Sequence, residues 1–245
     1  MIIASAQIRS LNHNFAGNLD KHLRFAECAA EHNADLILFP ETSLTGYTLD
    51  HAAEYALTPD DPRLDPLRAL SSAKGIHIAA GAPVRVNDQL HISTLIFHPG
   101  NSVSLYTKHY LHPGEERVFA PNHFFDPQLV IGSANTSFAI CADITNPLHP
   151  AAAHDKGSSL YCAGIFYTPK GIAEAYEQLG GYSRTYSMTI VMSNFVGESY
   201  SLAAAGQSAV WHCNDEPAGK LDSSREGILL LHLNENECTA LPVYL

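Results

Sequence analysis

Apolar residues along the chain form short unbroken runs that alternate with longer stretches of helical spacing. The unbroken runs are bounded by glycine, proline, asparagine or serine, which is typical of buried β-strands. They predict strands at 2–8, 36–39, 76–83, 160–166 and 189–195.

The stretches between these runs predict helices. In the first stretch, residues 18–30, apolar residues recur every three or four positions. The second stretch opens with Asp61 before Pro62, which is a typical helix start. Gly75 and Gly157 are suited to left-handed helix ends. The predicted helices cover residues 18–30, 61–75, 147–156 and 170–187.

Residues 90–97 and 102–107 predict a hairpin, because Pro99-Gly100-Asn101 between them is a turn sequence. Further strands are expected at 138–140, 207–212 and 227–233. Continuous apolar strands with intervening helices indicate an α/β fold in which helices cover a sheet. No linker-like segment interrupts the pattern, so we expect a single domain over residues 1–245.

Composition and charge narrow the possible partners. Of the 245 residues 46% are hydrophobic, yet no apolar run approaches the roughly 18 residues that a membrane span needs. The net charge of −11, without a basic patch, disfavours nucleic acid and anionic membranes as partners. The opening MIIASAQI lacks the features of a secretory signal, and the five cysteines include no C-x-x-C pair. We therefore expect reduced thiols and a cytoplasmic location.

Three reactive side chains each follow a predicted buried strand. Glu41 comes after LILFP, Lys108 ends the hairpin, and Cys141 comes directly after FAI. They are separated by 67 and 33 residues, so only the fold can bring them together. We expect neighbouring parallel strands to do so, because the carboxyl ends of such strands share one edge of a sheet.

These three residue types suit acyl transfer. A carboxylate can accept the proton of a thiol, and the resulting thiolate is the nucleophile. With a lysine ammonium beside both groups, this proton transfer leaves the net charge of the site unchanged. The ammonium and the backbone N–H of Ala142 could stabilise the oxyanion, which is worth roughly 3 kcal/mol per well-placed donor.

Three strings surround Glu41, Lys108 and Cys141: FPETSLTGY (39–47), YTKHYLHPGEERVFAPN (106–122) and FAICADITNP (138–147). They occur in the order of the three signature regions of the nitrilase superfamily of carbon–nitrogen hydrolases, and the chain resembles that superfamily. TIVMSNFVG (189–197) and AAGQSAVW (204–211) extend the resemblance to nearly the whole chain.

The resemblance implies a four-layer α-β-β-α sandwich and a catalytic triad of Glu41, Lys108 and Cys141. It also implies a second glutamate, Glu115 or alternatively Glu116, that positions the substrate and the lysine. Tyr47 and Asn194 occupy supporting positions. The implied substrate is a small amide, ω-amide or N-carbamoyl compound, hydrolysed through a thioester without a cofactor or metal, by a homodimer.

Two features leave alternatives open. Residues 142–146, Ala-Asp-Ile-Thr-Asn, depart from the family pattern. This departure leaves open an altered oxyanion loop and the alternative of an acyltransferase or a binding module. Fourteen histidines also allow a Cys141–His dyad or a metal site, for example at His109 with His112 or at His149 with His154. No H-E-x-x-H or zinc-finger spacing supports the metal interpretation.

Overall fold

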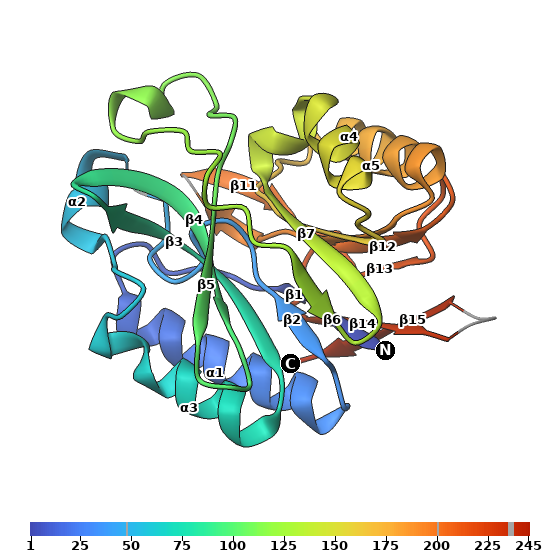
Figure 1. Cartoon of the computed structure of the whole chain (residues 1–245), viewed down its shortest axis with the longest axis horizontal. Helices are drawn as coiled ribbons and strands as arrows, with labels where there is room; N and C mark the ends of the chain where they lie inside the picture. Colours follow the sequence, from blue (N-terminus) through green and yellow to red (C-terminus); the bar gives the residue numbers. More distant parts are fainter. Residues whose placement is uncertain (48, 200, 235–237) are drawn as a thin grey trace.

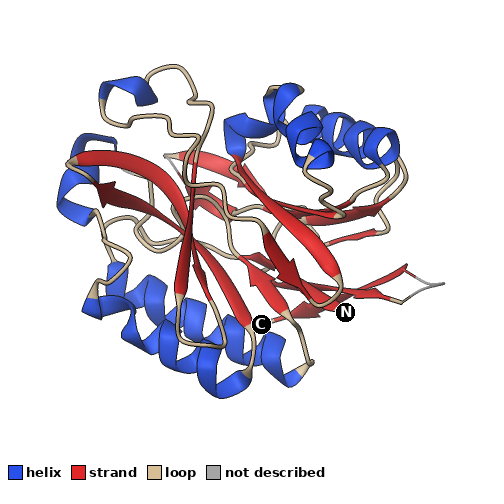
Figure 2. Cartoon of the chain, viewed as in Figure 1, coloured by secondary structure: helices blue, strands red, loops and turns tan. Residues whose placement is uncertain are grey.

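The computed structural model describes residues 1–47, 49–199, 201–234 and 238–245. Two β-sheets lie face to face, and helices cover the outer face of each (Figures 1 and 2). Helices α1 (Phe15–Glu31) and α3 (Asp65–Lys74) cover one sheet, whereas α4 (Leu148–Asp155) and α5 (Ile172–Tyr186) cover the other. This is the four-layer α-β-β-α arrangement that the resemblance predicts.

The first sheet has seven strands in the order β15-β14-β1-β2-β3-β4-β5. Strands β1, β2 and β3 run parallel, and every other neighbouring pair is antiparallel. The bounds in chain order are β1 Ile2–Gln7, β2 Leu36–Leu38, β3 His77–Val86, β4 Gln89–Phe97, β5 Val103–Thr107, β14 Gly227–Leu233 and β15 Cys238–Tyr244.

The second sheet has six strands in the order β13-β12-β9-β8-β7-β6, with β7, β8 and β9 parallel. Its bounds are β6 Leu129–Ile131, β7 Ala134–Ile140, β8 Leu160–Gly164, β9 Thr189–Ser193, β12 Ala209–His212 and β13 Gly219–Lys220. A separate hairpin pairs β10 (Val196–Ser199) with β11 (Leu202–Ala205). Helix α2 is Ala52–Tyr55, and 3-10 turns occupy Leu49–His51, Pro62–Leu64, Glu115–Arg117 and Cys141–Thr145.

The unbroken apolar runs are explained by burial on both faces of each sheet. In β2, Leu36 and Leu38 pack between the two sheets, whereas Ile37 packs on the side of α1 and α3. In β7, Phe138 packs between the sheets and Ala139 packs on the side of α4 and α5. Three apolar layers therefore fill the three spaces between the four layers of the fold.

Most expected elements are confirmed, with ends shifted by a few residues. The hairpin of β4 and β5 forms as expected, and Lys108 directly follows it. Gly75 and Gly157 both have positive φ angles, 70° and 79°, at the ends of their helices. Five strands, β6, β10, β11, β13 and β15, were not predicted from the sequence. In the described residues, no helix is long and apolar enough to cross a membrane.

The expected route by which the fold gathers the three reactive residues is wrong. They do not follow neighbouring parallel strands: β3 and β4 separate β2 from β5, and β7 belongs to the other sheet. The face-to-face packing of the sheets brings the strand ends together instead, since β5 and β4 both contact β7.

Candidate active site

Lys108 is buried between two carboxylates. Its Nζ donates to Glu41 Oε1 at 2.8 Å and lies 2.9 Å from both oxygens of Glu115. The three side chains are almost wholly inaccessible, Lys108 being 1% exposed and each glutamate 3%. Glu41 follows β2, Lys108 follows β5, and Glu115 begins a 3-10 turn in the loop after Lys108.

The two carboxylates keep Lys108 charged. Burial alone would lower the pKa of Lys108, but Glu41, Cys141 and Glu115 raise it above its usual value. Burial and the neighbouring Glu41 raise the pKa of Glu115, while Lys108 opposes that rise. A buried charge of this kind is tolerated because it is paired and hydrogen-bonded.

The structure places Glu115, and not Glu116, beside Lys108. The Glu115 carboxylate also accepts hydrogen bonds from the Tyr47 hydroxyl at 3.3 Å and from the backbone N–H of His112 at 2.8 Å. Glu116 is exposed and accepts from the backbone N–H of Gly114. Of the two glutamates left open by the sequence, Glu115 therefore has the contacts that a positioning role needs.

Cys141 sits at a sharp turn between β7 and a 3-10 turn. Its φ of +41° lies in the left-handed region, which residues other than glycine seldom adopt. The thiol donates to the carbonyl oxygen of Phe166 at 3.6 Å. Burial and the charge of Glu41 raise the pKa of Cys141 to about 12, although Lys108 opposes the rise. The resting sulfur is therefore a neutral thiol.

The thiol of Cys141 and the carboxylates of Glu41 and Glu115 border one cavity of about 480 Å³. This volume is in the range of small-molecule binding sites. Cys141, Glu41 and Glu115 all line it, so a bound molecule can meet the thiol and both carboxylates. The other lining residues are Tyr47, His112, Ala142, Thr145, Phe166, Tyr167, Thr168, Glu174 and Leu202.

Asn194, expected in a supporting position, does not line this cavity. It is fully buried, and its side chain accepts from the backbone N–H of Tyr167 at 3.0 Å and donates to the carbonyl oxygens of Tyr167 and Gly206. Asn194 thus fixes the backbone of Tyr167, which forms part of the cavity wall. Tyr47 and Ala142 are in the wall itself.

Asp143 was not predicted as a site residue, yet it connects the segments that carry Lys108 and Cys141. One carboxylate oxygen accepts from the backbone N–H groups of His109 and Tyr110 at 3.0 and 2.8 Å. The other accepts from the Tyr106 hydroxyl at 2.6 Å and from Ile140 N–H at 2.9 Å. Its place two residues after Cys141, beyond a buried strand, was the available signal.

Two glycines leave room for the segment that carries Glu41. A Cβ built on Gly81 of β3 would lie 2.4 Å from both Pro40 O and Thr42 N. A Cβ built on Gly164 of β8 would lie 2.8 Å from Phe39 O. The Glu41 backbone is thus held closely between strands of the two sheets.

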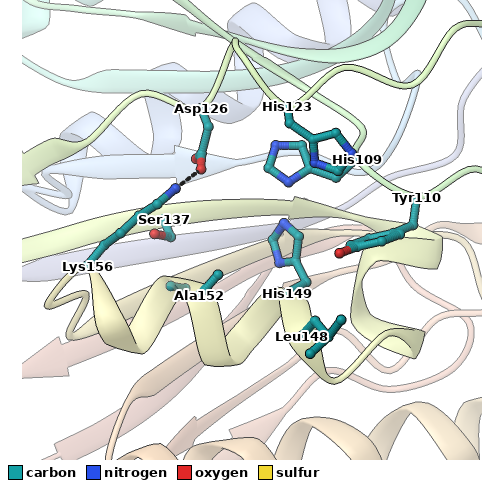
Figure 3. A pocket seen from close by; sticks show the side chains of 10 residues that line it. His109, Tyr110, His123, Asp126, Ser137, Leu148, His149, Ala152 and Lys156 are labelled. Carbon is teal, nitrogen blue, oxygen red and sulfur yellow. Dashed lines mark hydrogen bonds and ion pairs between the residues drawn. The ribbon is translucent and has the colours of Figure 1, made fainter.

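The structure separates both histidine pairs that the sequence offered as metal ligands. His109 and His149 line a second cavity of about 170 Å³ (Figure 3), whereas His112 lines the catalytic cavity and His154 packs against Tyr186. Rings of His109, His123 and His149 face one another there, and Lys156 pairs with Asp126. Burial lowers the pKa of His109 and of His149 to about 4, so both are neutral near pH 7. Among the residues that the structure describes, no three His, Cys, Asp or Glu side chains form a group that could hold a metal ion.

His149 instead has a hydrogen-bonding role. Its two ring nitrogens lie 2.8 Å from the Tyr106 hydroxyl and 2.7 Å from the Tyr161 hydroxyl. Tyr106 in turn donates to Asp143, so the second cavity adjoins the network that supports the Cys141 turn. In the described part of the chain, the hydrogen-bond partner found for the Cys141 thiol is a backbone carbonyl and not a histidine.

A model of the family described as carbon-nitrogen hydrolase matches residues 2–243. The chain belongs to the carbon–nitrogen hydrolase family. The resemblance to the nitrilase superfamily is thereby confirmed, and the chain is a hydrolase by family.

Solved structures of similar fold include an amidase of the nitrilase superfamily from Nesterenkonia AN1. It superposes with a TM-score of 0.87 at 24% identity, covering 96% of this hydrolase and 91% of that chain. Another structure of the Nesterenkonia amidase, with acrylamide added to its active-site cysteine, has a TM-score of 0.85 at 24% identity, covering 96% and 93% of the two chains. At this identity the likeness concerns the fold.

A curated relative is the glutamine-dependent NAD(+) synthetase of Thermotoga maritima. It is 24% identical over 247 residues, which cover 96% of this hydrolase but 42% of the relative. The chain therefore spans less than half the length of that relative.

We predict that Gly81→Ala lowers kcat/KM by roughly 100-fold, because the added methyl must displace the backbone around Glu41. The same overpacking should lower the free energy of unfolding by about 1–3 kcal/mol. Gly100→Ala is the control, since its Cβ would meet nothing within 4 Å. Steady-state kinetics measures kcat/KM, and urea unfolding measures the free energy of unfolding. A folded Gly81→Ala enzyme with undiminished kcat/KM would show that this close packing does not position Glu41.

We also predict that Cys141 contributes no thiolate absorbance between about pH 5 and 9 in the free enzyme. The sign follows from the pKa: a raised value keeps the proton on sulfur until the solution is strongly alkaline. The ultraviolet difference between the native protein and Cys141→Ala isolates this thiol from the other cysteines. A difference band that titrates near neutral pH would instead indicate a thiolate stabilised by a cation.

Proposed function

We propose that the hydrolase cleaves small amides through a thioester on Cys141, with Glu41 as general base and acid and with Lys108 and Glu115 in supporting roles. The observation that carries this proposal is the shared cavity: Cys141, Glu41 and Glu115 line it together, and Lys108 contacts both carboxylates. The Nesterenkonia structures, described as an amidase with an active-site cysteine, favour amides over nitriles as the first substrates to test.

The first half-reaction forms the thioester. As an amide enters, Glu41 takes the thiol proton and the sulfur attacks the carbonyl carbon. Because Cys141 is neutral at rest, its ionisation must accompany substrate attack, and the proton shift to Glu41 creates no additional net charge. The Lys108 ammonium and the Ala142 N–H stabilise the oxyanion, and Glu41 returns the proton to the departing amine.

The second half-reaction releases the acid. A water molecule enters the position left by the amine, and Glu41 removes its proton as the oxygen attacks the thioester carbonyl. The carbon–sulfur bond then breaks, and the proton held by Glu41 returns to the sulfur. Glu115 stays hydrogen-bonded to Lys108 in both half-reactions and fixes the ammonium against the cavity. Assembly as a homodimer and a cytoplasmic location remain predictions.

We expect Cys141→Ala to abolish ammonia release from every primary amide that the native protein hydrolyses, because no other thiol lines the cavity among the described residues. Removing a catalytic nucleophile typically costs several orders of magnitude in kcat. Cys213→Ala is the matched control, since Cys213 is exposed. A coupled assay of ammonia over a panel of amides, ureides and nitriles gives the comparison. Full activity in Cys141→Ala would remove Cys141 from the mechanism.

The curated relative supports a second candidate function, the release of ammonia from glutamine for use by a partner protein. The chain matches 42% of the length of a glutamine-dependent synthetase, which is compatible with a unit that supplies ammonia. Measuring kcat/KM for L-glutamine beside simple aliphatic amides distinguishes the two. We expect the aliphatic amides to be preferred, and a clear preference for glutamine would favour the second candidate.

A further inference from the structure

The wall of the catalytic cavity is acidic. Three carboxylates line it, those of Glu41, Glu115 and Glu174. The lysine nearest to them, Lys108, is 1% exposed and already paired with Glu41 and Glu115. No lysine or arginine is among the described residues that line the cavity, and positions 48, 200 and 235–237 hold no Lys or Arg in the sequence. Apart from Lys108, which the two catalytic carboxylates hold, an anionic group on a substrate would therefore find no lysine or arginine in the described part of this wall.

Glu174 lines the cavity and is exposed to solvent. It sits in the first turn of α5, where the helix dipole favours a carboxylate. Its carboxylate accepts a long hydrogen bond of 3.4 Å from Gln178 on the same helix. In the described part of the chain, Glu174 makes no salt bridge with a basic side chain.

Aromatic side chains line the cavity that Glu174 shares with the thiol. Tyr47, Phe166 and Tyr167 belong to the wall. Tyr167 lines the same cavity as Cys141 and Glu174, and burial raises the pKa of its phenol, so the ring stays neutral. Aromatic faces attract cations within about 6 Å, and a carboxylate beyond them completes the surroundings of an ammonium group.

We propose that the cavity selects amides that carry a cationic amine at the end remote from the scissile bond, with Glu174 as the residue that determines this specificity. The inference rests on the proposed function. It also implies that ω-amides of dicarboxylic acids are poor substrates, since their free carboxylate would lie beside Glu174. The net charge of −11 further favours the approach of cationic molecules.

The test is a set of primary amides of matched chain length that end in an ammonium, a methyl or a carboxylate group. Every member releases the same ammonia, so the kcat/KM values compare the tails alone. We expect the ammonium amide to exceed the methyl amide by about two- to fivefold, the range of an exposed ion pair, and to exceed the carboxylate amide by more than tenfold.

Substitution of Glu174 tests the assignment of the residue. Glu174→Gln should reduce the ratio of ammonium to methyl amide to near one, and Glu174→Lys should favour the carboxylate amide. Glu177→Gln removes the same charge from an exposed position of α5 that does not line the cavity, so it should keep the native ratio. Equal ratios in the native protein, Glu174→Gln and Glu174→Lys would overturn the inference.

Binding separates this inference from the proposed function. Calorimetry on Cys141→Ala measures the affinities of the same amides without turnover. The cation site is supported if Cys141→Ala binds the ammonium amide more tightly than the methyl amide and if Cys141→Ala/Glu174→Gln loses this preference. The same binding result without any amide hydrolysis by the native protein would keep the cation site and overturn the proposed function. Hydrolysis that depends on Cys141 but shows no tail preference, in binding or in kcat/KM, leaves the proposed function standing and overturns the cation site.

Discussion

The ion pairs of Lys108 with Glu41 and Glu115 are the interaction on which the rest of the site depends. An ammonium that is 1% exposed is stable only if carboxylates surround it, because a single unpaired charge in such a place costs several kcal/mol. Three separate segments must therefore meet at one point. Gly81 and Gly164 leave room for the Glu41 segment, and Asp143 connects the backbone after Lys108 to the turn at Cys141.

This arrangement also explains why the nucleophile can rest as a thiol. Glu41 disfavours a thiolate beside it, and burial adds to that effect, so the free site does not hold a reactive sulfur anion. Transfer of the thiol proton to Glu41 removes the negative charge that opposed the thiolate. Base and nucleophile are thus coupled, and the Lys108 ammonium remains beside them throughout. Glu174 adds a third carboxylate to the wall of the same cavity.

The sequence predicts the parts of the fold in which pattern and burial agree. Strands such as β2 are apolar on every position because both faces are covered, and helices such as α3 end at a glycine with positive φ. Strand β15 was not predicted because it is an edge strand without a fully buried residue and contains Pro242, so it lacks an unbroken apolar run. The pairing of two sheets followed from the resemblance alone, since the spacing of apolar residues does not reveal which strands face each other.

The candidate site was predictable to a similar depth. Glu41, Lys108 and Cys141 stand out as reactive residues after buried strands. The three strings around them point to the hydrolysis of a carbon–nitrogen bond. Only the structure distinguishes Glu115 from Glu116, because adjacent residues of a polar turn differ in direction and not in pattern. Asp143 and Gly81 gain their significance from contacts between distant segments, and Glu174 from lining the same cavity as Cys141, which local sequence does not encode.

The most direct test of the central claim is to identify the residue that carries the acyl group. Glu41→Gln is mixed briefly, at about pH 9, with an activated ester whose leaving group departs without protonation, so that hydroxide takes the thiol proton in place of Glu41. The thioester should accumulate because no carboxylate is left at position 41 to activate water. Peptide mass spectrometry is expected to find the acyl mass on Cys141 in Glu41→Gln and to find none in Glu41→Gln/Cys141→Ala. An acyl group on Cys162 or on another residue, with Cys141 unmodified, would contradict the proposed chemistry of the site.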